Sequence, residues 1–360
     1  MARNYKEVNA QKVARISGID ALRSLALLSV VFFHYDQLFP FGYLGLEMFL
    51  VISGFFISRM LLNSYAEDKP LPFIPFMIHR LFKILPSYLF FLLFGNLLYW
   101  LFCRYHGING FIPLSAILPY LLFFRNYIVS TYYWSFEHIW SLCVEVQFYI
   151  FIGLLFLLLA LKINIQKNKR LLYMLLFMTI GIMIYKIYSV LYLGLPVNLN
   201  SIVYRLDAFG WGIIAALVIQ FYPDMFSDKK FLNVLLLAGS LLLFVNGFLH
   251  YNYIPHNFRI HYAHFSYPPI FSLILLGVFL KDFTGMPVFR YISLYSYNWY
   301  LWHPLVYSIV RFQFENSIFA FGLYFISSLL IAVITTNYLE QPVLDLRKKI
   351  KSIDFAYRKP

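Results

Sequence analysis

Apolar runs of membrane-spanning length follow one another along almost the whole chain. A helix needs about 20 apolar residues to cross a bilayer, and only helices and closed barrels satisfy their own backbone hydrogen bonds in lipid. With 61% hydrophobic and 12% charged residues, the chain has too few polar side chains to cover a soluble globule. The sequence predicts an all-α polytopic bundle of about ten transmembrane helices. The runs lie near 19–39, 42–62, 84–103, 142–161, 171–192, 204–221, 232–249, 268–280, 291–310 and 317–338.

Three segments need separate treatment. The stretch 111–124 is short and contains Pro113 and Pro119, so we expect one short re-entrant or interfacial segment there. The run 268–280 is short for a span, so it would cross the membrane only together with neighbouring segments. The segment 250–267, rich in His and Tyr, is expected to be the largest polar loop and to lie outside.

The distribution of basic residues sets the expected orientation. With a cytoplasmic N-terminus and ten crossings, 22 of the 29 Lys and Arg fall in cytoplasmic segments and five fall outside. Cytoplasmic loops carry such an excess, so both termini are predicted to be cytoplasmic. The same rule explains the net charge of +13 without a nucleic-acid partner. We expect a single transmembrane domain over 1–345 and a basic cytoplasmic tail over 346–360.

Two ionisable residues lie within the first run. Arg23 and His34 are eleven residues apart, which places them on one helix face about 16 Å apart along the axis. Charged or titratable groups inside a span are costly and mark functional sites by default. The alternative is that Arg23 reaches the headgroups and His34 is a packing residue.

The sequence around these two residues resembles that of the acyltransferase-3 family of membrane O-acyltransferases. Arg23 and His34 match its Arg-x10-His motif. HRLFKILPSY at 79–88 resembles its Arg-x-x-Arg segment, with Arg80 and Lys83 in the basic positions; Lys83 keeps the charge but loses the planar fork that grips phosphate. Further matches are HIWSLCVEVQFYI at 138–150, YRLDAFGWG at 204–212, SYNWYLWHP at 296–304 and Glu340–Pro342.

The resemblance implies an O-acyltransferase of the bacterial cytoplasmic (inner) membrane. It would move an acyl group, most often acetyl, from cytoplasmic acyl-CoA (acetyl-CoA) to a hydroxyl of a glycan or lipid-linked sugar. Lipopolysaccharide and other surface or periplasmic glycans are candidate acceptors. The competing interpretation is a transporter or flippase of lipid-linked sugars, which buried charge in ten spans also fits; no inverted repeat supports it.

The expected roles follow the two ends of the bundle. His34 would be the general base, because its unperturbed pKa lies near neutrality, and Glu145 would orient its ring. Arg23, Arg80 and Lys83 would bind the donor's phosphates from the cytoplasmic side, and Arg23 is also a catalytic candidate. Near the outer face, the sequence predicts one cluster of four side chains, in which Arg205 and Asp207 would bind the acceptor. His303 is a further acceptor-binding candidate. The cluster comprises His34, Glu145, Arg205 and Asp207.

Other polar residues have structural or alternative interpretations. His303 precedes Pro304 and is at least as suited to helix packing. Glu340 is expected to be structural, paired with a basic residue, and Lys186 has no assignment. Cys103 and Cys143 lie near the expected outer face, where a disulfide could form, although membrane thiols are more often free. No metal site is expected, because His250, His256, His261 and His264 have irregular spacing and no adjacent Cys or acid.

Overall fold

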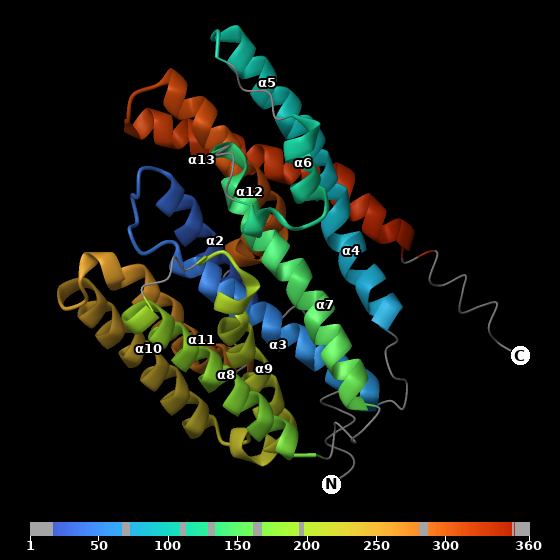
Figure 1. Cartoon of the computed structure of the whole chain (residues 1–360), viewed down its shortest axis with the longest axis vertical. Coiled ribbons are helices and arrows are strands. Elements are labelled where there is room, and N and C mark those ends of the chain that lie inside the picture. The colour runs from blue at the N-terminus through green and yellow to red at the C-terminus, as the bar shows by residue number, and fades with distance from the viewer. Residues whose placement is uncertain are drawn as a thin grey trace, which may run out of the picture.

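The computed structural model describes residues 17–66, 73–108, 113–128, 134–160, 168–193, 198–280, 287–347 and 349. Every regular element in this part of the chain is helical, as the apolar composition predicts (Figure 1). The first helices are α2 (Ser17–His34), α3 (Leu44–Ala66), α4 (Phe73–Phe90), α5 (Asn96–Tyr105), α6 (Leu114–Leu121) and α7 (Trp140–Ala160). The others are α8 (Arg170–Tyr188), α9 (Leu206–Phe221), α10 (Lys229–Asn252), α11 (Arg259–Leu280), α12 (Pro287–Gln313) and α13 (Ile318–Thr335).

Short π-helical and 3-10 segments extend or join these helices. The π segment η1 (Phe91–Gly95) joins α4 to α5, η4 (Ser189–Leu193) extends α8, and η8 (Thr336–Glu340) extends α13. The 3-10 segment η3 (Trp134–Ile139) precedes α7. π-Helical turns are often found at functional sites.

Seven helical segments within the described ranges are long and apolar enough to cross a membrane. They contain α3, α4–α5, α7, α8, α10, α11 and α13, while α9 is a shorter apolar helix. The chain is thus a multi-pass helical protein. Helix α6 has eight residues, about 12 Å of length, and is too short to cross.

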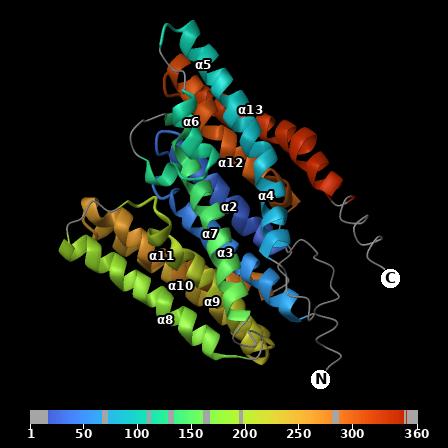
Figure 2. The same cartoon turned by 45° about the vertical axis from the view of Figure 1, so that its right-hand side comes forward.

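The helices form two groups with α2, α3 and α7 between them (Figures 1 and 2). One group contains α8 to α11, and the other contains α4, α5, α12 and α13. Helix α3 packs most extensively against α9, while α2 packs against α3 and α12. The central helices therefore connect both halves of the bundle.

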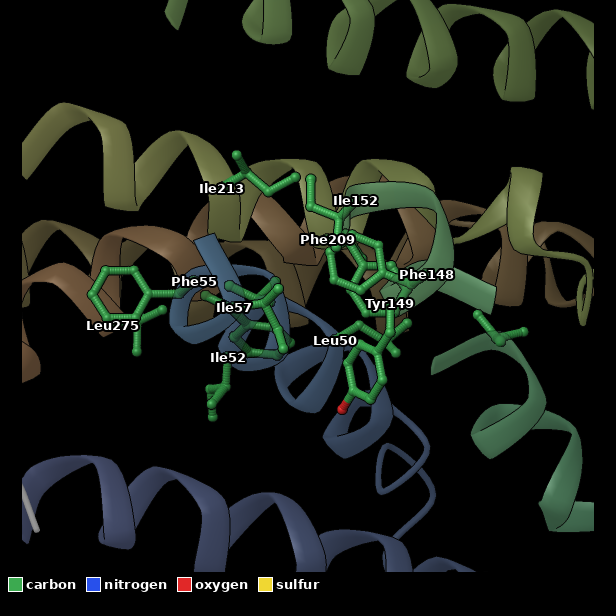
Figure 3. Packing of buried hydrophobic residues seen from close by; sticks show 14 of the residues in the cluster. Leu50, Ile52, Phe55, Ile57, Phe148, Tyr149, Ile152, Phe209, Ile213 and Leu275 are labelled. Carbon is green, nitrogen blue, oxygen red and sulfur yellow. The ribbon is translucent and has the colours of Figure 1, made fainter. Parts of the chain in front are cut away.

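The closest helix contact in the centre depends on glycine. A Cβ atom at Gly54 of α3 would lie 2.2 Å from the carbonyl oxygen of Phe209 in α9, and one at Gly212 would lie 2.1 Å from that of Val51. Small residues let backbones approach closely in membrane bundles. Beside this contact, Phe148 of α7 stacks on Phe209 with ring centroids 3.7 Å apart (Figure 3).

Two expectations from the sequence need correction. Helix α11 begins at Arg259, not near 268, so the expected polar loop at 250–267 is largely helical and its connection covers only a few residues. Helix α4 begins at Phe73, so Arg80 and Lys83 lie on a helix. In both cases polar side chains lowered the apolar signal, although tertiary contacts hold them inside helices. Cys103 and Cys143 are both buried and free, which is the alternative that the sequence favoured.

Two other expectations extend beyond the described residues. The N-terminal basic segment before residue 17 and most of the tail at 346–360 lie outside them. The last long helical segment runs to Arg347.

Candidate active site

Three histidines from separate elements meet at one end of the bundle, and we call them the histidine group: His34, His138 and His303. His34 is the last residue of α2, His138 lies in η3, and His303 lies in α12. The ring centroids of His34 and His303 are 4.9 Å apart, and those of His138 and His303 are 5.7 Å apart. Helix α2 ends here because Asp36 and Gln37 take positive φ angles of 46° and 55°, which no helix continues.

The hydrogen bonds of the histidine group define which nitrogen of His34 is free. His303 lies with Nδ1 3.1 Å from the Trp299 carbonyl oxygen, so Nδ1–H donates and its Nε2 is an acceptor. Nδ1 of His34 lies 2.9 Å from the Val30 carbonyl oxygen and 3.3 Å from this Nε2. Both neighbours of Nδ1 accept, so neutral His34 carries its proton there and its Nε2 has a lone pair. A base of this type holds the tautomer used in Ser-His-Asp sites.

His138 is the member of the histidine group whose role the sequence did not predict. Its Nε2 lies 3.1 Å from the Leu301 carbonyl oxygen, and its buried Nδ1 has no hydrogen-bond partner within the described residues. A signal was present, since His138 is the first residue of the HIWSLCVEVQFYI segment at 138–150 that matches the family. The Tyr300 hydroxyl donates a hydrogen bond of 3.0 Å to the backbone carbonyl oxygen of His138 and so helps to hold this residue in place.

The three predicted donor-binding cations, Arg23, Arg80 and Lys83, lie together, and we call them the basic cluster. Lys83 interacts electrostatically with Arg23 and Arg80 and with two carboxylates, Glu340 and Glu145. The Arg80 guanidinium lies 5.6 Å from the ring centroid of Tyr149. Because Arg23 and His34 both belong to the continuous helix α2, the basic cluster and the histidine group are about 16 Å apart along that helix.

Glu145 lies nearer the basic cluster than the sequence predicted. Its carboxylate accepts from the Ser53 hydroxyl at 3.0 Å and from the Tyr149 hydroxyl. It follows His138 by seven residues, which is about 10 Å of helix. The ring of His34 is therefore held by His303 and a backbone carbonyl, and not by Glu145.

Glu340 also faces the basic cluster. It lies in the π segment η8 and accepts from the Asn298 amide at 2.7 Å. Lys83 is an electrostatic neighbour of this carboxylate, and the hydrogen bond of Glu340 is to the Asn298 amide rather than to a basic residue.

Arg205 and Asp207 belong to a separate group, the ionic network, which also contains Glu47, Lys186 and His264. Arg205 donates to the Glu47 carboxylate, and Lys186 lies 2.8 Å and 2.7 Å from the two carboxylate oxygens of Asp207. Residues two apart on a helix point in different directions, so Arg205 and Asp207 pair with different helices. Buried charges are stable only when paired, and these pairs separate both residues from His34. The structure therefore does not form the predicted single cluster of four side chains.

The loop between α2 and α3 lies between the histidine group and the ionic network. Its Tyr43 ring is 6.5 Å from that of His264 and 5.7 Å from that of Phe33, which in turn is 5.4 Å from the His34 ring. Burial raises the pKa of Tyr43 to about 12, so its phenol stays protonated. Because these ring contacts join them, the histidine group and the ionic network occupy the same end of the bundle.

The sequence comparisons define the class of protein that carries this site. The profile of the family described as "Acyltransferase domain" matches residues 16–337. The chain belongs to this acyltransferase-3 family.

Curated relatives share the same region. A Staphylococcus aureus (strain COL) protein named "Putative O-acetyltransferase SACOL0978" is 26% identical over 360 aligned residues, covering 92% of this chain and 58% of the relative. "O-acetyltransferase OatA" of Staphylococcus aureus (strain NCTC 8325 / PS 47) is 21% identical over 392, covering 96% and 59%. The chain thus spans less than two thirds of the length of these relatives. No solved structure matches it.

Proposed function

We propose that this protein is a membrane O-acyltransferase that moves an acyl group, most often acetyl, from cytoplasmic acyl-CoA to a hydroxyl of a cell-surface or periplasmic glycan. The single observation that carries the proposal is the hydrogen bonding of His34. Its Nδ1 faces two acceptors, which leaves the Nε2 lone pair available for a substrate proton. The names of the relatives support the acetyl group and the oxygen acceptor.

In the proposed topology, the chain crosses the inner membrane of a bacterium ten times, and both termini lie in the cytoplasm. The ten spans are α2, α3, α4–α5, α7 and α8 to α13, within a single domain over 1–345 that ends in a basic tail over 346–360. In this orientation the basic cluster lies toward the cytoplasm, where coenzyme A is found. The histidine group lies toward the outer face, where a glycan would arrive.

The residues divide the reaction between the two ends. Arg23, Arg80 and Lys83 hold the phosphates of the donor, and its pantetheine arm extends toward His34 over the distance of about 16 Å along α2. The acceptor oxygen attacks the thioester carbonyl carbon as its proton moves to Nε2 of His34. The C–S bond then breaks, and the proton passes to the departing thiolate, which restores neutral His34.

The test compares surface glycans from cells with the wild-type gene, a deletion, His34→Gln and His256→Gln. His256 is an exposed histidine of the α10–α11 connection and is the matched control. We expect mass spectrometry to show an added acyl mass in the wild type and the control that the deletion and His34→Gln lack, with equal amounts of glycan at the surface. General-base catalysis contributes about 10²–10⁴-fold, so the loss in His34→Gln should be nearly complete. Loss of glycan from the surface would instead indicate a transporter.

A second measurement tests donor binding. Arg80→Gln should weaken the binding of coenzyme A to the purified protein about tenfold or more, because hydrogen bonds to charged groups contribute about 1.5–3 kcal/mol. Arg104→Gln is the matched control, because Arg104 is an exposed residue near the other end of α4–α5. Equal affinities for the two variants would contradict the assignment of the basic cluster.

A further inference from the structure

The turn that follows His34 holds two residues in an unfavourable backbone conformation. Asp36 and Gln37 have φ angles of 46° and 55°, in the left-handed region where glycine is the usual residue at a helix end. Aspartate tolerates this region better than most side chains, whereas glutamine does not. Backbone of this kind persists only where other contacts hold it, and it is found most often at functional sites. Contacts from elsewhere in the fold must therefore hold this turn.

The Asp36 carboxylate links this turn to helix α12. One carboxylate oxygen accepts a hydrogen bond of 2.7 Å from the Tyr307 hydroxyl, and the other lies 2.9 Å from Nε of Arg311. The side chains of this ion pair are 29% and 27% exposed, so both are partly shielded from water. Because each oxygen has its own partner, the carboxylate is fixed in rotation as well as in position. We call Asp36, Tyr307 and Arg311 the Asp36 clamp.

Helix α12 carries the partners of His34 and of Asp36 on one face. His303, Tyr307 and Arg311 follow one another at intervals of four residues, and side chains at this spacing are neighbours on a helix surface. Nε2 of His303 lies 3.3 Å from Nδ1 of His34, while the next two side chains hold Asp36. One helix therefore fixes both the imidazole ring of His34 and the chain two residues beyond it.

The residue between His34 and Asp36 is anchored separately. Tyr35 is 3% exposed, its hydroxyl donates to the Ser317 carbonyl oxygen over 3.1 Å, and its ring stacks on that of Tyr324 with centroids 5.4 Å apart. These contacts hold the start of the loop against α13. Replacement of Asp36 should therefore leave the loop attached and change only the turn next to His34.

The chemistry of His34 depends on its position. It is the last residue of α2, and helix ends fray. Its Nδ1–H is directed at the Val30 carbonyl oxygen at 2.9 Å and at His303 at 3.3 Å. The second distance is already at the long end for a hydrogen bond, so a small displacement of the ring breaks it. A misplacement of about 1 Å at a reacting group can lower a rate about 10²-fold.

We propose that Asp36, held by Tyr307 and Arg311, is a positioning residue that fixes His34 against His303. This inference rests on the proposed function, in which His34 is the general base, and it adds the clamp that holds this base. The carboxylate is occupied by two side chains of α12, so it acts through the two-residue chain segment and not on the imidazole ring.

The test measures acetyl transfer from radiolabelled acetyl-CoA to glycan in membranes of cells that express each variant of the full chain. The initial rates give kcat and the KM for acetyl-CoA. The variants are Asp36→Ala, Asp36→Gly, Asp36→Asn and Tyr307→Phe. The matched control is Glu315→Ala, which removes an exposed carboxylate from the α12–α13 connection at the same end of α12. Melting temperatures of the purified proteins show whether each variant is folded.

We expect Asp36→Ala to lower kcat about 10- to 100-fold with an unchanged KM, and Glu315→Ala to match the wild type. Asp36→Gly is the decisive variant, because glycine adopts the left-handed turn without strain but cannot reach α12. It should lose as much activity as Asp36→Ala. Asp36→Asn should recover part of the rate, since its amide oxygen still accepts from Tyr307 and asparagine tolerates this backbone. If Asp36→Ala fails to fold, Tyr307→Phe decides, with an expected loss in kcat of about tenfold.

A second comparison shows whether the clamp acts through the position of His34. In a His303→Leu background the contact that the clamp maintains is already absent, so Asp36→Ala should lower kcat much less than it does in the wild type. Multiplication of the two separate losses would overturn the proposal. So would a wild-type kcat in Asp36→Gly, or a raised KM with an unchanged kcat in Asp36→Ala.

The wild type separates this inference from the proposed function. If wild-type membranes transfer acetyl groups and the folded Asp36 and Tyr307 variants do so at the same rate, the clamp proposal fails and the proposed function stands. If wild-type membranes transfer no more label than membranes of the deletion strain, the proposed function itself fails.

Discussion

At the scale of single residues, the partner of His34 is the feature that most affects its chemistry. A carboxylate beside a catalytic histidine stabilises the imidazolium form, whereas a neutral imidazole such as His303 holds the tautomer with less electrostatic gain. The exposed carboxylate closest in sequence, Asp36, is paired with Arg311 at 2.9 Å and with the Tyr307 hydroxyl at 2.7 Å. His303 is thus a positioning residue in the proposed mechanism.

The first prediction concerns this positioning role. His303→Leu removes the acceptor from Nδ1 of His34 and should lower kcat about tenfold, the effect of one hydrogen bond, with little change in the KM for the acyl donor. His303→Gln can present an amide oxygen to the same nitrogen and should recover part of the rate. Steady-state acyl transfer by the purified variants measures both effects. Equal rates for the Leu and Gln variants would favour a packing role.

At the scale of elements, one buried ion pair joins three helices. Lys186 of α8 pairs with Asp207 of α9 and donates to the carbonyl oxygen of His264 in α11. Both charged side chains are almost completely buried. Burying charges is costly, so a buried pair adds little net stability, and we expect this one to specify how the three helices meet.

The second prediction follows from the asymmetry of buried pairs. Lys186→Met leaves the Asp207 charge uncompensated and should cost about 3–5 kcal/mol, whereas the double variant Lys186→Met with Asp207→Leu should recover most of that loss. Thermal unfolding of the purified proteins in one detergent measures both. A double variant as unstable as the single one would show that the two side chains do not act as a pair.

The third prediction concerns the close approach of α3 and α9. Gly54→Ala places a methyl group against the Phe209 carbonyl oxygen and should destabilise the protein by about 1–3 kcal/mol, the usual cost of overpacking. Gly322→Ala in α13 is the matched control, because an added Cβ there meets no atom within 4 Å. The melting temperature should fall only in the Gly54 variant. Equal melting temperatures would mean that the two helices can separate without cost.

At the scale of the whole molecule, the proposed ten-span topology would place the two ends of the bundle in different compartments. The α9–α10 connection, which contains Ser227, would lie in the cytoplasm, and the end of α5 at Tyr105 would lie outside. Both sites are exposed, whereas the native thiols Cys103 and Cys143 are 2% and 0% exposed. The wild type is therefore a suitable background for thiol labelling.

The fourth prediction tests this topology. A membrane-impermeant maleimide added to intact spheroplasts should label Tyr105→Cys and not Ser227→Cys, and permeabilised membranes should allow both to react. Gel-shift detection of the labelled protein gives the result. Labelling of Ser227→Cys from outside would show that the orientation is the reverse of the proposed one. The basic cluster would then face away from cytoplasmic coenzyme A.

The sequence alone determined the helical membrane class and most of the helix positions. These depend on hydropathy and on the helix period, which are properties of neighbouring residues. The same period placed Arg23 and His34 on one face, and family motifs identified Arg80 and Lys83. The prediction from hydropathy failed at 250–267, because His and Tyr side chains lowered the apolar signal of helices that bury them.

Tertiary structure alone decided which side chains meet across helices. Apolar helices can pack side by side in many arrangements, since hydropathy carries no information on neighbours or rotation. For this reason the partner of His34 is His303 and not Glu145, while Arg205 and Asp207 pair with Glu47 and Lys186. The need to compensate every buried charge selected these pairs, and only the packed bundle shows where each counter-charge lies.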